Sequence, residues 1–379
     1  MDKKKIIVGL SGGVDSAIAA YLLKKQGYDV TGAFMRNWDA IANNDISGNP
    51  TLDEPMCPQE QDYEDAKKVA DQLEIPLLRV DFIKEYWDNV FMYFLDEYKK
   101  GRTPNPDIFC NKYIKFEAFL NWAKAQGFDQ IATGHYAKRV DKDGMTYLYK
   151  SFDQNKDQTY FLSQLNQSQL QASIFPLGDI DKHEVRAIAN ELNLAVASKK
   201  DSTGVCFIGE RHFKEFLFNY LPMKKGPIVD INTDKKIATH DGVFYYTIGQ
   251  RKGLGIGGLK DYPDAKSWYV CKKDVKHNIL YVANDENDEH LLADSALISD
   301  VNFNAIRPEN GQQIHAKFRY RQKDLGVKIF LIDENSVRLE FDQAYKAITP
   351  GQAAVFYDDN VCLGGGIIQE VYYKNRKIN

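Results

Sequence analysis

The residues Ile6-Ile7-Val8-Gly9-Leu10-Ser11-Gly12-Gly13-Val14-Asp15-Ser16 decide the fold of this chain. The first five form a β-branched run bounded by glycine, which is typical of a buried strand, and residues 17–26 predict a helix that ends at Gly27. Two adjacent glycines between a strand and a helix let backbone amides surround an anion at the positive end of the helix. Ser11 and Ser16 can add hydrogen bonds, and Asp15 can hold Mg²⁺ beside phosphates. An ordinary glycine turn with a serine N-cap is the alternative interpretation.

This segment is not the GxxxxGK[ST] loop that grips the β- and γ-phosphates, because no lysine follows the glycines. It matches instead the loop of ATP-dependent enzymes that form an adenylate and release pyrophosphate. ATP is therefore the expected nucleotide, with Mg²⁺ held at Asp15.

The segments around this loop alternate between strand and helix patterns. Strands are predicted at 29–35, 77–80 and 130–133, and helices at 61–73, 85–98 and 112–126. The intervening residues 37–60 have no periodicity and predict a long loop. This alternation predicts an α/β fold with a doubly wound parallel sheet, which binds ligands at the carboxyl ends of its strands.

The pattern changes after about Asp201. One more helix is predicted within 205–221, and then short β runs follow at 242–248, 268–271, 279–282, 313–320, 327–332, 336–341 and 353–357, as in a small β-barrel. We therefore predict an ATP-binding catalytic domain at 1–210, a central domain at 211–284 and a C-terminal β-barrel domain at 285–379.

Composition indicates a globular protein. Of 379 residues, 44% are hydrophobic and 27% charged, and no apolar run approaches the ~20 residues needed to cross a membrane. The apolar run after Lys5 is too short for a signal peptide, whose core has ~7–15 residues. We expect a cytoplasmic protein without membrane partners.

Local charge is more informative than the net charge of −4. Residues 315–328 contain five basic residues and one acidic residue. Within 313–322, residues 314, 316, 318 and 320 would share one strand face, with the basic side chains His315, Lys317, Arg319 and Arg321 on the other. Such a row suits an RNA backbone, and a solvated barrel face is the alternative.

Two of the five cysteines lie in settings that suggest chemistry. The odd number and the absence of a CxxC pair argue against a disulfide framework or structural zinc. Cys110 follows Asn105-Pro106-Asp107 at the front of the predicted helix 112–126, where a nearby Lys112 and the helix N-terminus would favour the thiolate. Alternatively, Asp107 caps this helix and Cys110 packs in the core.

Cys206 lies in a glycine-bracketed segment, Gly204-Val205-Cys206-Phe207-Ile208-Gly209, with basic residues on both sides. Such a segment suits a thiolate that must reach two places. A lone loop cysteine is often inert, but a second placed cysteine and an ATP loop favour the reactive interpretation.

Seven motifs then occur in one order along the chain. They are SGGVDS at 11–16, GRTPNPDIFCN at 101–111, ATGHYA at 132–137, KDQTYFL at 156–162, GVCFIGER at 204–211, TIGQRKGLGI at 247–256 and RYRQ at 319–322. On these motifs the chain resembles, along essentially its whole length, the bacterial tRNA-specific 2-thiouridylases that modify the anticodon wobble uridine. The pair around Cys110 and Cys206 is more specific than the loop, which several families share.

The resemblance implies a fold and a set of site residues. The fold would be a HUP or PP-loop nucleotide-binding domain followed by a central domain and a C-terminal β-barrel. ATP would contact Gly9, Leu10, Ser11, Gly12, Gly13, Val14, Asp15, Ser16, Met35 and Gly134. The target base would meet Asn105, Pro106 and Asp107, since chemistry on a base requires it to leave the stack. The tRNA would contact His135, Lys156, Asp157, Gln158, Arg319, Tyr320 and Gln352.

The resemblance also implies a reaction and partners. ATP would adenylate the C2 oxygen of the uridine, Cys206 would carry a persulfide, Cys110 would be the nucleophile paired with it, and Asp107 would act as general acid or base. The partners would be wobble-uridine tRNAs, of the Lys, Glu and Gln acceptor types, and a persulfide donor such as a cysteine desulfurase or a sulfur-relay protein. A Cys110–Cys206 disulfide would remain for a cellular reductant to open.

Three alternatives remain at this point. An ATP-pyrophosphatase ligase or amidotransferase, such as an argininosuccinate- or NAD-synthase-like protein, would use the loop but give the two cysteines no task. A non-catalytic RNA-binding protein would use the basic strand alone. An iron–sulfur cluster on Cys110, Cys206 and a third ligand also stays open.

Overall fold

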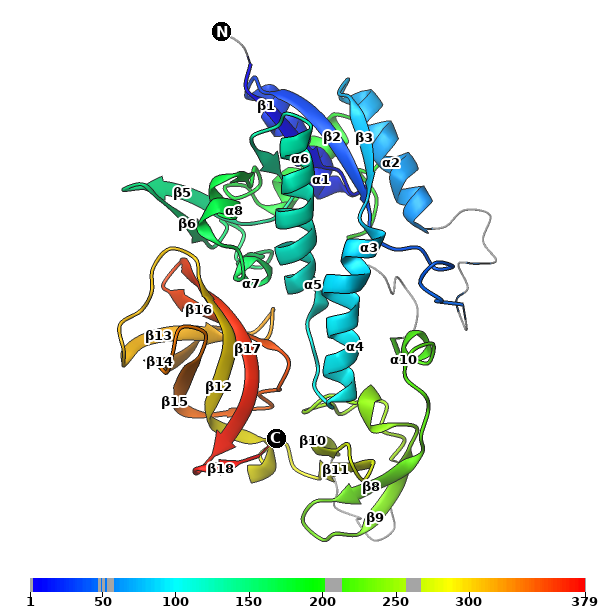
Figure 1. Cartoon of the computed structure of the whole chain (residues 1–379), viewed down its shortest axis with the longest axis vertical. Helices are drawn as coiled ribbons and strands as arrows, with labels where there is room; N and C mark the ends of the chain where they lie inside the picture. Colours follow the sequence, from blue (N-terminus) through cyan, green and yellow to red (C-terminus); the bar gives the residue numbers. More distant parts are fainter. Residues whose placement is uncertain are drawn as a thin grey trace.

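A five-stranded parallel sheet forms the upper part of the molecule (Figure 1). The computed structural model describes residues 3–46, 49, 52, 58–201, 213–256 and 267–378. The strand order of this sheet is β3-β2-β1-β4-β7. The strands are β1 (Lys5–Gly9), β2 (Asp29–Arg36), β3 (Leu77–Asp81), β4 (Ile131–Ala132) and β7 (Ser173–Ile174), and every pairing is parallel. The strand order reverses at β1, so the carboxyl end of β1 lies where doubly wound sheets bind ligands. The predicted α/β fold class is confirmed.

Helices cover both faces of this sheet. On one face, α1 (Val14–Lys25), α2 (Pro58–Gln72) and α9 (Lys182–Glu191) pack against Ile6 and Val8. The other face, which includes Ile7, is covered by two long helical segments. These are α3 (Ile83–Tyr86), η2 (Trp87–Phe91) and α4 (Met92–Lys99), and then α5 (Pro106–Phe109), η3 (Cys110–Ala118) and α6 (Phe119–Ala125). Burial from both sides explains why the strands read as continuous apolar runs.

The structure extends the predicted helices and adds elements that the sequence did not indicate. The helix predicted at 85–98 spans Ile83–Lys99, and the helix predicted at 112–126 begins six residues earlier, at Pro106. Up to residue 201 the additional elements are a hairpin of β5 (Lys138–Lys142) and β6 (Met145–Tyr149), the short helices α7 (Thr159–Leu162) and α8 (Gln167–Gln171), β7 and α9.

A four-stranded sheet follows in the middle of the chain, after α10 (Phe213–Leu217). Its order is β10-β11-β8-β9, with β8 (Gly226–Asp230), β9 (Lys236–His240), β10 (Tyr269–Asp274) and β11 (Ile279–Ala283). The β run predicted at 242–248 is wrong, because this stretch holds the 3₁₀ turn η4 (Val243–Tyr245) and coil. Its β-favouring side chains reflect burial rather than strand pairing.

The C-terminal part is a closed six-stranded barrel. Its strands are β12 (Leu292–Phe303), which follows the 3₁₀ turn η5 (Glu289–Leu291), β13 (Gln312–Lys317), β14 (Leu325–Leu331), β15 (Val337–Lys346), β16 (Ala353–Asp358) and β17 (Val361–Tyr373), with the short β18 (Arg376–Lys377) beside β17. Pairing of β12 with both β15 and β17 closes the barrel. The predicted barrel is confirmed, although β12 and β17 were not predicted.

The basic strand predicted at 313–322 is shorter than expected. Ile314, Ala316 and Phe318 are buried in the barrel core as predicted. The strand ends at Lys317, however, and residues 318–321 form bends and a turn, so Arg319 and Arg321 do not continue one strand face.

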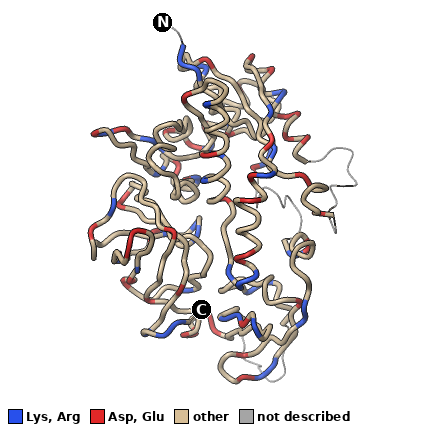
Figure 2. Tube along the Cα trace, in the orientation of Figure 1, with Lys and Arg blue, Asp and Glu red and all other residues tan. Residues whose placement is uncertain are grey.

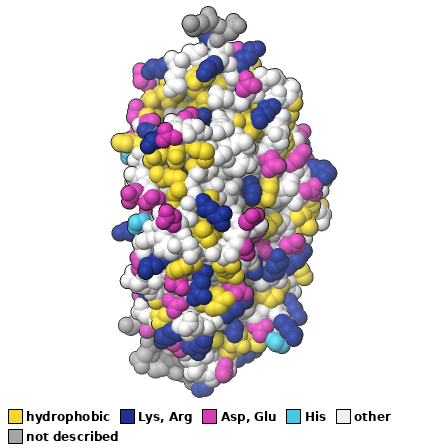
Figure 3. All heavy atoms as spheres, turned by 60° about the vertical axis from the view of Figure 1, so that its left-hand side comes forward, with side chains coloured by type: hydrophobic (Ala, Val, Ile, Leu, Met, Phe, Trp, Pro, Cys, Tyr) yellow, Lys and Arg dark blue, Asp and Glu magenta, His cyan; other side chains and the backbone are white. Residues whose placement is uncertain are grey.

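Two features concern the molecule as a whole. The hairpin of the N-terminal part joins the barrel sheet, because Leu148 of β6 pairs with Cys362 of β17. Acidic and basic residues are interspersed along the trace and over the face that Figure 3 shows (Figures 2 and 3). Among the described residues, no helix is both long and apolar enough to cross a membrane.

Candidate active site

The loop between β1 and α1 is folded so that its backbone surrounds the start of the helix. The Ser16 hydroxyl donates to the carbonyl oxygen of Gly13 at 3.0 Å and accepts from the amide of Ser11 at 3.2 Å. Gly12 has a φ of 72°, and a Cβ there would lie 2.3 Å from the carbonyl oxygen of Asp62. The N-cap of α1 is Gly13, without a side-chain cap, so the serine N-cap alternative is wrong and the first amides of α1 are left for an anion.

Three of the residues expected near ATP meet at this loop. A Cβ on Gly9 would lie 3.0 Å from Cε of Met35, so the Met35 side chain covers the end of β1. Gly134 follows β4, and a Cβ there would lie 2.7 Å from backbone atoms of Asp15 and Ser16. The carboxyl ends of β1, β2 and β4 therefore meet around the start of α1, the position expected for a nucleotide in this fold.

The Asp15 carboxylate is fixed by two residues that the sequence analysis did not single out. Oδ1 accepts hydrogen bonds from the hydroxyl of Tyr136 at 2.7 Å and from Nζ of Lys182 at 2.6 Å. Burial and the Asp15 charge raise the pKa of Tyr136, so this phenol keeps its proton and donates. Oδ2 of Asp15 accepts no hydrogen bond from the residues that the structure describes. Oδ2 of Asp15 is thus available to coordinate Mg²⁺, which prefers oxygen ligands.

Lys199 is a second cation at the loop, and the sequence near the loop does not predict it. Its Nζ donates to the Gly12 carbonyl oxygen at 3.0 Å, to Asp62 at 2.7 Å and to Asp65 at 2.8 Å. It therefore joins the loop to α2, although 187 residues separate Lys199 from Gly12. Lys199 therefore supports the shape of the loop from a distant part of the chain.

The predicted base-contacting segment forms the start of a helix. Asn105 caps α5, since its side chain accepts from the amide of Asp107 at 3.1 Å, and Pro106 occupies the first turn. Asp107 therefore does not cap the helix, but the other half of that alternative is confirmed, because Cys110 packs in the hydrophobic core. We expected Cys110 at the N-terminus of the helix. Because the helix begins at Pro106, Cys110 instead lies one turn inside it and is 6% exposed. Burial raises the pKa of Asp107, and the charge of Lys115 opposes this shift.

The chain just before this helix is held by the other two parts of the molecule. The amide of Thr103 donates to the carbonyl oxygen of Pro350 at 3.0 Å, and Nε2 of Gln352 donates to the carbonyl oxygen of Thr103 at 2.7 Å. The hydroxyl of Thr103 donates to that of Thr247 at 3.4 Å. Gln352, expected to contact tRNA, is thus also a support for the base-contacting segment.

The other residues expected to contact tRNA differ in their surroundings. His135 is 8% exposed, lies 2.7 Å from the Thr133 hydroxyl, and has a pKa held well below its usual range by burial. Asp157 is 5% exposed and accepts from the Ser151 amide and the Thr159 hydroxyl. These side chains bond inward, which makes them supports of the segment that carries them.

The remaining tRNA candidates form a connected group. The Gln158 side chain accepts from the amide of Tyr136 at 2.9 Å, and Nζ of Lys156 lies 2.7 Å from Asp201. The ring of Tyr320 packs against Phe161 with centroids 4.4 Å apart. The barrel therefore contacts the segment that contains Lys156.

Arg319 joins the barrel to the central part. Its Nη2 donates to the carbonyl oxygens of Ile248 and Ala347, each at 3.1 Å, and to the hydroxyl of Thr349 at 3.3 Å. Burial lowers its pKa.

Cys206 and Cys57 lie outside the described residues. Cys271 and Cys362 are buried, and burial raises the pKa of the Cys362 thiol to about 12, so neither is suited to act as a thiolate. In the described ranges no cluster of three or more His, Cys, Asp or Glu side chains is placed to hold a metal ion.

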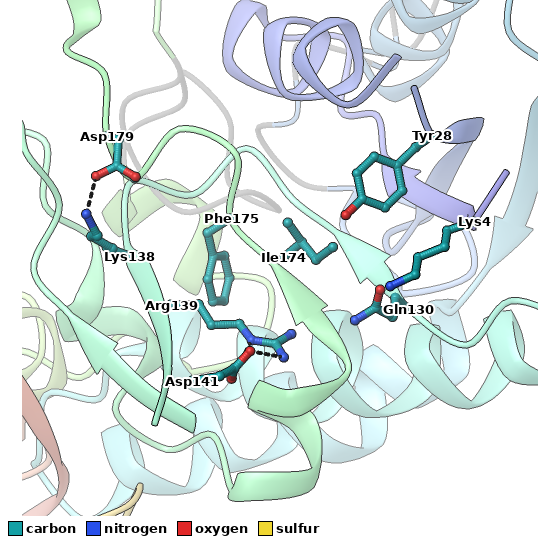
Figure 4. A pocket seen from close by; sticks show the side chains of 10 residues that line it. Lys4, Tyr28, Gln130, Lys138, Arg139, Asp141, Ile174, Phe175 and Asp179 are labelled. Atoms are coloured by element: carbon teal, nitrogen blue, oxygen red, sulfur yellow. Dashed lines mark hydrogen bonds and ion pairs between the residues drawn. The ribbon is translucent and has the colours of Figure 1, made fainter. Parts of the chain in front are cut away.

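A pocket of about 360 Å³ lies elsewhere on the nucleotide-binding part (Figure 4). It is lined by Lys4 and Gln130, which precede β1 and β4, and by the ion pairs Lys138–Asp179 and Arg139–Asp141. These strand starts are at the edge of the sheet opposite to the glycine loop, so this pocket is not the nucleotide site.

Fold and loop together define a class: an α/β nucleotide-binding protein with a PP-type loop, extended by two β domains. Three family models match the chain in the same three parts. One described as "tRNA methyl transferase HUP domain" matches residues 4–210, "tRNA methyl transferase PRC-barrel domain" matches 214–284, and "Aminomethyltransferase beta-barrel domain" matches 293–368.

Similar curated proteins identify one family within this class. The chain is 55% identical to "tRNA-specific 2-thiouridylase MnmA" of Mycoplasma capricolum, over 97% of this chain and 99% of that one. It is also 55% identical to the protein of that name from Mycoplasmopsis synoviae (100% and 98%), and 54% identical to that from Staphylococcus carnosus (97% and 96%). The chain belongs to the tRNA-specific 2-thiouridylase family.

Proposed function

We propose that this chain is an ATP-dependent tRNA-uridine 2-sulfurtransferase that acts on the wobble uridine, position 34, of the anticodon. The observation that carries the proposal is the loop from Ser11 to Ser16, whose uncapped amides, Asp15 and neighbouring Gly134 and Met35 meet at one edge of the sheet. A family relationship over the full length supports the same activity. Because the substrate is tRNA, we expect the reaction to take place in the cytoplasm.

The first step is activation of the base. The uridine C2 oxygen attacks the α-phosphorus of ATP, the bond to the β-phosphate breaks, and pyrophosphate leaves with the electron pair. The residues that serve this step are the backbone amides of Gly12 and Gly13, which would bind phosphate oxygens, and Asp15, which would hold Mg²⁺. The ion would screen phosphate charge when bound. Asn105 and Asp107, at the start of α5, would meet the flipped base.

The second step delivers sulfur. A thiolate of Cys110 attacks Sγ of the Cys206 persulfide, and the terminal sulfur leaves as hydrosulfide with the electron pair of the broken S–S bond. The hydrosulfide attacks C2 and expels AMP. A Cys110–Cys206 disulfide remains, and a dithiol reductant reopens it. The carboxyl of Asp107, with its raised pKa, is suited to exchange protons during these steps.

The hydrogen bonds of Thr103 support a role of all three parts of the chain in positioning the base. The segment that precedes Asn105 is bonded to Pro350, Gln352 and Thr247, so contacts of tRNA with the central and C-terminal domains bear directly on the catalytic helix. We accordingly assign nucleotide chemistry to residues 1–210 and tRNA contacts to 211–284 and 285–379. A cysteine desulfurase or sulfur-relay protein would load Cys206.

The test uses the purified chain, ATP, Mg²⁺ and unmodified tRNA transcripts of the Lys, Glu or Gln type. We expect pyrophosphate release with a transcript carrying U34 and none with its C34 counterpart. With a desulfurase and cysteine added, 2-thiouridine should be found at position 34 by mass spectrometry of digested tRNA. Pyrophosphate release that needs no tRNA would favour a ligase or amidotransferase, and tRNA binding without any release would favour a non-catalytic RNA-binding protein; either result refutes the proposal.

A further inference from the structure

A cluster of charged side chains surrounds Asp15 beside the glycine loop, and its members other than Asp15 have no role in the steps above. Lys182, the first residue of α9, has its Nζ 2.6 Å from Oδ1 of Asp15 and 2.8 Å from Oδ1 of Asp201. The side chain of Lys182 is 12% exposed. The Asp201 carboxylate also forms ion pairs with Nζ of Lys156 and Nη2 of Arg186, each at 2.7 Å.

We propose that Lys182 contacts the phosphates of ATP that leave as pyrophosphate, and that Asp15 and Asp201 hold its ammonium group beside the loop for this purpose. The proposal rests on the proposed function and identifies the cation that serves the leaving group. Four observations support it: the loop has no basic residue, the Lys182 ammonium has an unused donor, neighbouring groups hold Lys182 in place, and the donors of Lys199 are all used.

The loop itself, Ser11–Ser16, contains no basic residue. Backbone amides carry only partial charges, whereas a triphosphate carries several full negative charges. P-loop proteins meet this need with a lysine directly after the glycines, and none stands there in this chain. Lys182 brings a full positive charge to Asp15, in the first turn of α1, from a separate helix.

The ammonium group has a donor left for a ligand. A lysine ammonium has three N–H donors, and two of those on Lys182 are directed at Asp15 and Asp201. The residues that the structure describes offer no third hydrogen-bond acceptor, and Lys182 Nζ lies 5.9 Å from the centre of the Tyr136 ring. The third donor is therefore available to a phosphate oxygen at the loop.

Several groups hold Lys182 and its helix in place. Its backbone amide donates to Asp153 at 3.1 Å, and Asp181 caps its helix. Burial alone would raise the pKa of Asp201, but hydrogen bonds from Lys156 and Lys182 outweigh it and hold this pKa well below its usual range. Asp201 is therefore ionised at neutral pH and keeps Lys182 in one place, so little side-chain entropy remains to be lost when a ligand binds.

Lys199 provides the contrast. Its Nζ already has three acceptors, which are Gly12, Asp62 and Asp65. All its donors are used to hold the loop in shape, so Lys199 is a support for every nucleotide contact. Lys182 instead has a donor to spare and should matter only for ligands with the phosphates that leave.

The experiment compares two ligands on the full-length chain by calorimetry, inorganic pyrophosphate and AMP, each with Mg²⁺. AMP retains the adenosine and α-phosphate contacts but lacks the leaving phosphates. For Lys182→Met we expect pyrophosphate affinity to fall at least about tenfold, the effect of one charge-assisted hydrogen bond, and AMP affinity to stay within about twofold. Lys182→Arg retains the charge and should recover most of the pyrophosphate affinity.

Two further variants serve as controls. Lys138→Met removes a more exposed lysine–aspartate ion pair, with Asp179, in the β5 hairpin away from the loop, and should leave both affinities unchanged. Lys199→Met should weaken both ligands together, because it disturbs the loop itself.

Three results would overturn the proposal: unchanged pyrophosphate affinity in Lys182→Met, equal loss of AMP and pyrophosphate in that variant, or no pyrophosphate binding by the wild-type chain. These measurements involve no RNA and no turnover. Failure of the wild-type chain to release pyrophosphate with U34 tRNA would therefore refute the proposed function without deciding the role of Lys182.

Discussion

Replacing Arg319 and Arg321 separately should distinguish support of the fold from contact with RNA. The two arginines lie two residues apart after β13, but only Arg319 is bonded across the molecule, to Ile248, Ala347 and Thr349. Arg321 is exposed and forms no hydrogen bond or ion pair with any residue in the described ranges.

The expected magnitudes follow from these surroundings. A hydrogen bond to a charged group contributes about 1.5–3 kcal/mol when buried, and the three bonds of Arg319 share one nitrogen near the surface, so Arg319→Ala should cost about 2 kcal/mol. For a domain of about 100 residues, such as 285–379, this corresponds to a fall in Tm of roughly 8–16 °C. An exposed substitution such as Arg321→Ala should change stability by less than about 0.5 kcal/mol. If Arg321 contacts single-stranded RNA, the same variant should reduce the log–log salt slope of tRNA binding by ~0.7.

The assay combines thermal unfolding with filter binding of tRNA over a series of salt concentrations. Arg319→Lys serves as the matched variant, since it retains a charge but cannot reproduce the guanidinium geometry, and it should fall between wild type and Arg319→Ala. Equal Tm values for Arg319→Ala and wild type would refute the structural assignment. A large loss of Tm in Arg321→Ala, or an unchanged salt slope, would refute the assignment of that residue to RNA contact.

Three further predictions concern the chemistry. Asp15→Ala should abolish pyrophosphate release while tRNA affinity changes by less than about twofold, because it removes a phosphate-site ligand and no RNA contact; undiminished release would contradict the role of the loop. Cys206→Ser should stop thiolation and spare tRNA-dependent pyrophosphate release, and Cys110→Ser should leave persulfide on Cys206, detectable by intact-protein mass spectrometry; wild-type 2-thiouridine output from either variant would exclude the two-cysteine mechanism. Burial raises the pKa of Asp107, so the folded state binds this proton more tightly than the unfolded state, and stability is lost as pH rises through the folded-state pKa. Asp107→Asn should therefore have a higher Tm than wild type at pH 8, with a difference that shrinks on acidification, and a difference independent of pH would contradict this reasoning.

What the sequence predicted correctly was encoded locally. The strand, glycine turn and helix from Ile6 to Lys25 are adjacent in the chain, and their pattern is decided by neighbours within one turn. The same holds for the alternation of β2, α2 and β3, whose predicted limits differ from the structure by a few residues.

The parts that were missed depend on residues distant in the chain. Lys182 lies 167 residues from Asp15, and Lys199 lies 187 residues from Gly12, so no local pattern could assign either to the loop. The Cys110 helix begins earlier than predicted because Pro106, which would break the interior of a helix, fits the first helical turn behind the Asn105 cap. β17 was missed because three successive glycines, Gly364–Gly366, weaken the strand pattern; in the structure other backbones approach them too closely for a side chain.

The pairing of β6 with β17 has a consequence for how the chain folds during synthesis. The hairpin at 138–149 leaves the ribosome with its domain, but the strand that covers its edge begins only at Val361, roughly 200 residues later. At about 5–20 residues per second, this edge stays open for about 10–40 s. An open strand edge can pair with other chains. During this interval the nascent protein has an unpaired strand edge at Leu148 and Tyr149, which β17 covers in the finished fold.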